Sequence, residues 1–115
     1  MTDKQIVREL AKRYMELATS PKQLTAHRRM QDTNDLKIVR PPVLMDEIPW
    51  HQINIDNELT CICQDPRARR AEWLLRANLY RIKYFRCDAI LEPYFRVDKS
   101  YEETSIGWEV KEDIL

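Results

Sequence analysis

The sequence contains a single glycine and no apolar run of the roughly 18 residues that a membrane-spanning helix requires. It also lacks a net charge: nineteen basic and nineteen acidic residues cancel, which removes the long-range attraction to nucleic acid or to an anionic membrane. The amino terminus carries charged residues where a secretory signal would be apolar. These absences predict a cytoplasmic protein that binds neither membrane nor nucleic acid.

Cysteine is scarce, and its three positions do not suit a disulfide framework. The number is odd, and Cys61 and Cys63 are too close for an ordinary structural bridge. Together with Cys87 and His51 they carry the atom types of a zinc site. However, structural zinc pairs usually have two to four residues between the cysteines, and here there is one. We therefore predict free thiols and no metal in this chain.

Apolar residues at three- and four-residue spacing predict an amphipathic helix over residues 3–18, capped by Thr2 or Asp3. A second helix is predicted from Pro21, because Ser20 supplies the cap and proline is tolerated at the first helical position. This second helix has few apolar positions, so we expect it on the surface.

A third and longer helix is predicted from Pro66 to about Phe85. Asp65 supplies its cap, and a broad apolar stripe at helical spacing indicates burial against a sheet.

Three short segments have β character: residues 43–45, 59–64 and 89–97. In the second of them Leu59, Cys61 and Cys63 fall on one face and Thr60, Ile62 and Gln64 on the other, and Pro93 places the third at a sheet edge. The order helix, helix, strand, strand, helix, strand predicts an α/β fold with a strand-helix-strand crossover. Such a sheet would keep open edges unless more chain, or another copy, completed it.

The segment Arg40–His51, which reads RPPVLMDEIPWH, resembles the N-terminal region of the uroporphyrinogen decarboxylase and corrinoid methyltransferase family. Other pieces that fit the same family are Asp65-Pro66, Glu72–Arg76, Leu79-Tyr80, Asp88–Tyr94 and Gly107–Val110. The resemblance spans nearly the whole chain. It implies a (β/α)8 TIM-type barrel that is incomplete here, with a helical segment over residues 1–36 and the first strand-helix-strand part of the barrel over residues 37–115.

The resemblance also bears on the choice between two activities of the family, porphyrinogen decarboxylation and corrinoid-dependent methyl transfer. In uroporphyrinogen decarboxylases the matching stretch continues Met-Arg-Gln-Ala-Gly-Arg, and its arginines pair with substrate carboxylates. Here the region from Met45 to Trp50 has neither arginine, and Asp46 and Glu47 would repel a polycarboxylate. The resemblance therefore implies the corrinoid-dependent methyltransferase branch, whose zinc and corrinoid would be held by residues that this chain does not contain.

Asp46 and Glu47 follow a predicted strand, at the end where α/β enzymes build their sites. We predict them as catalytic acid/base groups and Trp50 and His51 as substrate-binding groups in the same pocket. The alternatives are a helix cap or a surface salt bridge for the carboxylates, a packed tryptophan and an exposed histidine.

Two functions follow from this reading. The first is the N-terminal part of a methyltransferase-like protein that contributes to a pocket for a small molecule or a corrinoid methyl carrier, inactive by itself. The second is a stand-alone protein-binding module without catalysis, which docks a partner through an open sheet edge or a basic helix. Self-assembly into a homo-oligomer is compatible with both.

Overall fold

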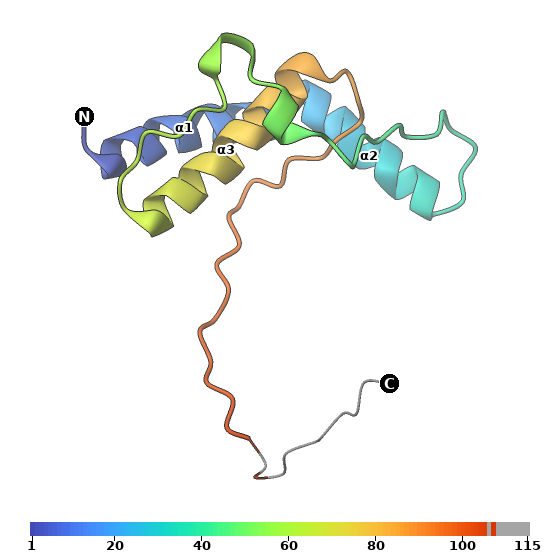
Figure 1. Ribbon diagram of the computed structural model, residues 1–115. Coiled ribbons are helices and arrows are strands. Elements are labelled where there is room, and N and C mark those ends of the chain that lie inside the picture. Colours follow the sequence, from blue (N-terminus) through green and yellow to red (C-terminus); the bar gives the residue numbers. More distant parts are fainter. Residues whose placement is uncertain (106, 108–115) are drawn as a thin grey trace, which may run out of the picture.

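The computed structural model describes residues 1–105 and 107, which form three α-helices and two short 3-10 helices (Figure 1). These elements are α1 (Asp3–Ala18), α2 (Pro21–Asn34), η1 (Trp50–Gln52), η2 (Ile55–Asn57) and α3 (Pro66–Tyr84). No β-strand occurs among the described residues, so the predicted α/β fold with the start of a TIM-type barrel is wrong. The predicted barrel residues 108–115, and the end of the resemblance at Trp108–Val110, lie outside the described part.

All three helices begin where the sequence predicts. Thr2 forms a capping box at the start of α1, and Ser20 accepts a hydrogen bond from the backbone at the start of α2. The Asp65 carboxylate accepts from Ala68 N at 2.9 Å at the start of α3. Each signal acts within three residues, which explains why these predictions are confirmed.

Helices α1 and α3 lie side by side and run in the same direction (Figure 1). The core between and around them is formed by Ile6, Leu10, Tyr14, Ala18, Cys63, Leu75 and Leu91. Helix α2 leads away from this pair and buries only Gln23 and Ala26. The expectation that α2 lies on the surface therefore holds for most of its length.

The predicted strand over residues 59–64 is an extended segment beside α3. Its alternation is present, because Leu59 and Cys63 are buried while Thr60 and Ile62 are exposed. The backbone N–H groups of Ile62 and Cys63, however, donate to the side chain of Glu72 instead of to a neighbouring strand. An alternating residue pattern predicts which face of a segment is buried. It does not predict which groups form hydrogen bonds with the backbone of that segment.

The other two predicted strands also remain unpaired. Val43, Leu44 and Met45 are exposed, so they are not a buried strand. Residues 89–92 rest against the helices, and from Pro93 the chain runs outward as an extended arm, orange in Figure 1. The radius of gyration is 19.2 Å, against about 13 Å for a compact chain of this length. The molecule is therefore less compact than a globular chain of this length, with much of its chain outside the core.

Candidate functional site

Asp46 and Glu47 lie exposed on the loop before η1 and make no hydrogen bond or ion pair with another described residue. They border an open depression of about 530 Å³ whose other lining residues include Ile53 and Phe85. The two consecutive acidic residues thus lie at the surface, at the edge of this depression. Their catalytic role stays a prediction.

Trp50 and His51, the predicted substrate-binding residues, do not line that depression. Trp50 packs edge-on against Trp73, with ring centroids 5.8 Å apart, and against Tyr80 at 6.3 Å. The Arg81 guanidinium lies 5.8 Å from the centroid of the Trp50 ring. His51 is exposed. The geometry therefore does not gather the four predicted residues into one enclosed site.

The cysteines are free thiols, and among the described residues no group of three or more His, Cys, Asp or Glu side chains is placed to hold a metal ion. Cys63 is fully buried, and its burial together with the nearby Glu72 carboxylate raises the pKa of the thiol to about 11. Cys61 and Cys87 are partly buried. Cys63 is thus a packing residue that stays protonated at neutral pH.

The most developed polar centre is one that sequence reasoning missed, around the buried carboxylate of Glu72. It accepts hydrogen bonds from Ile62 N at 3.0 Å, from Cys63 N at 2.8 Å and from Arg76 Nε at 2.8 Å. Burial by itself would raise the pKa of Glu72, but the backbone and Arg76 hydrogen bonds outweigh it and lower the pKa to about 2. A usable signal was present, since Glu72 occupies the apolar stripe of α3 with Arg76 one turn later.

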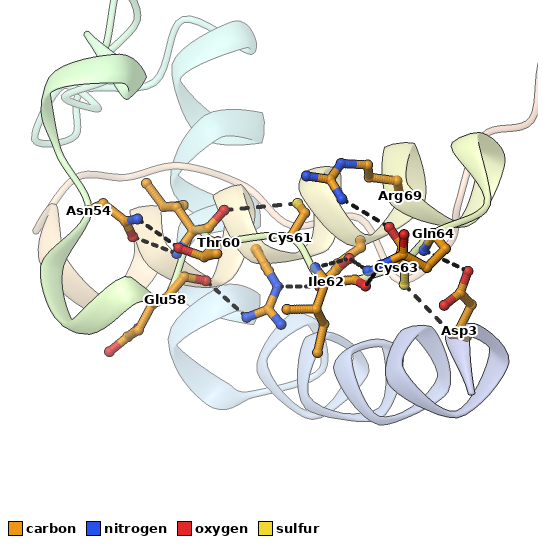
Figure 2. Close-up of polar contacts among 12 residues, drawn as sticks. Asp3, Asn54, Glu58, Thr60, Cys61, Ile62, Cys63, Gln64 and Arg69 are labelled. Carbon is orange, nitrogen blue, oxygen red and sulfur yellow. Dashed lines mark hydrogen bonds and ion pairs between the residues drawn. The ribbon is translucent and has the colours of Figure 1, made fainter. Parts of the chain in front are cut away.

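Further hydrogen bonds hold the same extended segment between α1 and α3 (Figure 2). The Asp3 carboxylate accepts from Gln64 N at 2.9 Å and from Asp65 N at 2.8 Å. Arg69 Nη1 donates to Cys63 O at 3.0 Å. These contacts satisfy backbone groups that a sheet would otherwise pair, so they are structural.

The side chain of Gln23 on α2 forms hydrogen bonds with the backbone of the segment after α3. Its Nε2 donates to Ala89 O at 3.0 Å, and its Oε1 accepts from Leu91 N at 2.8 Å. Tyr14 Oη donates to Glu92 O at 2.9 Å. The Gln23 amide thus forms the hydrogen bonds that a neighbouring strand would form with residues 89 and 91. It holds this segment against α2 just before the extended arm begins.

Asp88 forms a clamp that joins α2, the loop after it and the turn after α3. Its carboxylate accepts from Arg29 Nη1 at 2.7 Å, from Arg40 Nη2 at 2.8 Å and from Val43 N at 2.8 Å, and Asp88 N donates to Val43 O at 2.8 Å. The hydrogen bonds from Arg40 and Val43 lower the pKa of Asp88 to about 2. The clamp fixes the loop at residues 40–43 onto the helices.

The loop that the clamp holds, which we name the presented segment (residues 36–47), is also fixed at its beginning. Leu36 N donates to Thr33 O at 3.1 Å and Lys37 N donates to Asp32 O at 2.9 Å. These two hydrogen bonds form a Schellman motif at the C-terminal end of α2. Leu36 has φ 58°, a left-handed conformation that favours glycine. Its side chain is 90% exposed, and Ile38 is fully exposed.

Comparison with models of known families, with curated proteins and with solved structures found no match for this chain. The resemblance to the uroporphyrinogen decarboxylase and corrinoid methyltransferase family therefore stays a prediction from the sequence. In the part of the chain that the structure describes, no helix is long and apolar enough to cross a membrane.

Proposed function

We propose that this chain is a protein-binding module whose helices hold the presented segment for a partner. One observation carries the proposal: the segment is fixed by α2 and by the Asp88 clamp, yet its apolar side chains face outward. Ordering a residue costs roughly 1–2 kcal/mol of conformational entropy, and exposed apolar side chains return none of it. Burial against a partner supplies the missing stabilisation.

The exposed side chains are of the kind that drives association. On the presented segment they include Leu36, Ile38, Val43, Leu44 and Met45, which are between 43% and 104% exposed. Several exposed apolar side chains on one short ordered segment favour a binding site in a folded protein. The arm adds a second exposed apolar group, formed by Tyr94, Phe95, Val97 and Tyr101.

A second candidate is the N-terminal part of a corrinoid methyltransferase-like protein. It rests on the sequence resemblance alone. Several of the positions that carry the resemblance hold this structure together, which is a structural role. They are Arg40 and Asp88 in the clamp, Asp65 at the cap of α3, and Glu72 with Arg76 in the buried ion pair. In this version Asp46 and Glu47 contribute to the edge of a pocket, and the zinc and the corrinoid belong to the rest of the protein.

Binding through the presented segment is tested with purified components. The chain is immobilised, a captured protein is identified and purified, and its affinity is measured by calorimetry for the native chain and for Ile38→Asp. We expect Ile38→Asp to weaken binding at least about tenfold, because a charge would be desolvated in the interface. Leu24→Asp on α2 is the matched control, since Leu24 is 65% exposed and outside the segment. Equal affinities for all three chains would refute the proposal.

The two candidates predict different genes. An open reading frame beyond the Leu115 codon that encodes a His-x-Cys zinc motif would support the methyltransferase-like protein. A stop codon directly after it, together with normal expression of the folded chain, would support the stand-alone module.

A further inference from the structure

The two halves of the presented segment complement each other in charge and in apolar character. A cation, Lys37, precedes its first apolar pair, and an anion, Asp46, follows its second. The rigid pair Pro41-Pro42 lies at the centre. Reading outward from that centre in both directions matches Val39 with Leu44, Ile38 with Met45 and Lys37 with Asp46, whereas the innermost pair, Arg40 and Val43, and the outermost, Leu36 and Glu47, are not complementary.

The structure leaves these groups available. Asp46 has no hydrogen-bond or ion-pair partner among the described residues, and Lys37 has only a surface ion pair with Asp32 at 3.2 Å. Arg40, by contrast, is committed to the Asp88 clamp. The clamp therefore uses the middle of the segment and leaves both charged ends and the apolar side chains between them exposed.

We infer that the presented segment binds the presented segment of a second copy of this chain across a twofold axis. Twofold symmetry requires a self-complementary surface, in which residue i of one copy meets residue j of the other and the reverse. The segment meets this requirement, because Lys37 of each copy would face Asp46 of the other while the apolar pairs meet between them. This inference rests on the proposed function and names its partner.

The size of the segment sets the strength of the contact. Stable interfaces use about 20–30 residues on each side, and this one offers twelve from Leu36 to Glu47. The dimer is therefore weak and concentration-dependent, with a dissociation constant between about 1 μM and 1 mM. Rising salt concentration weakens it further, since both ion pairs are at the rim.

The test is sedimentation velocity of the full chain from about 10 μM to 1 mM, a range chosen to bracket that affinity. Lys37→Glu and Asp46→Lys are each expected to weaken the dimer at least about tenfold. Each reversed charge would face a like charge on the other copy, and the twofold axis repeats this repulsion in the second contact of the dimer. The double variant, with Lys37→Glu and Asp46→Lys together, restores opposite charges and is expected to return within about threefold of the native chain. Lys4→Glu on α1 makes the same charge change elsewhere and should leave the dimer unchanged.

The double variant also removes a local ambiguity. Lys37→Glu breaks the ion pair with Asp32 in both the single and the double variant, so only a contact between copies explains restoration in the double one. Circular dichroism at 222 nm confirms that each variant is folded.

A chain that stays monomeric to 1 mM, a dimer indifferent to both single reversals, or a double variant no better than the singles would overturn the inference. A monomeric chain that still binds another protein in an Ile38-dependent way would leave the proposed function standing. A chain that neither dimerises nor binds another protein through Ile38 would refute both the inference and the proposed function.

Discussion

Replacing Glu72 by glutamine removes the charge at the centre of the fold while nearly keeping the shape. The native carboxylate accepts from two backbone N–H groups and from Arg76, whereas a glutamine has one acceptor oxygen and turns an NH2 group toward a donor. A pKa lowered from 4.5 to about 2 corresponds to about 3 kcal/mol of stability at neutral pH. We expect Glu72→Gln to lower the free energy of unfolding by about that amount.

The same reasoning fixes the pH dependence. Because the pKa of Glu72 is lower in the folded state, its contribution is complete above the unfolded pKa near 4.5 and is lost as the pH falls toward 2. Asp88, whose pKa is lowered from 3.8 to about 2, acts in the same direction and over a similar range. The difference in stability between the native chain and Glu72→Gln should therefore shrink between about pH 5 and pH 2.

The assay is urea unfolding followed by circular dichroism, at pH 7 and at intervals down to pH 2.5. Glu16→Gln is the matched control, because Glu16 is exposed on α1 and its replacement should change stability by less than about 0.5 kcal/mol. If Glu72→Gln were as stable as Glu16→Gln at pH 7, the Glu72 carboxylate would not be what holds residues 62 and 63 against α3.

Two further substitutions and one labelling experiment test other parts of the fold. Gln23→Ala leaves Ala89 O and Leu91 N buried without partners, so urea unfolding should show a loss of about 2 kcal/mol; an unchanged midpoint would show that the two Gln23 hydrogen bonds do not stabilise the fold. Leu36→Gly relieves a left-handed leucine and should raise stability by about 0.5–1 kcal/mol, a reasoning that a lower melting temperature would refute. Cys63 should resist a thiol reagent at pH 7 until the chain unfolds, as peptide mapping of the labelled sites would show; labelling at the rate of an unfolded chain would disprove its burial.

The helices could be predicted because their signals are local. Thr2, Ser20 and Asp65 each bond to a backbone group three residues ahead, and the apolar spacing of α1 and α3 identifies the faces that pack together. The candidate site residues could be named from the sequence, but their arrangement in space could not be predicted. Nothing near Trp50 in the chain indicated that its ring would pack against Trp73 and Tyr80 and not beside Asp46.

The sequence by itself determined where the helices begin, and which residues of the extended segment 59–64 face inward. Only the tertiary structure decided what pairs with the backbone of those segments, because that partner lies far along the chain. Leu91 N meets the Gln23 side chain across 68 residues, and Val43 N meets Asp88 across 45. A backbone amide is satisfied equally by a strand or by a well-placed side chain, so the period-two pattern that predicted a sheet is equally compatible with the helical fold that forms.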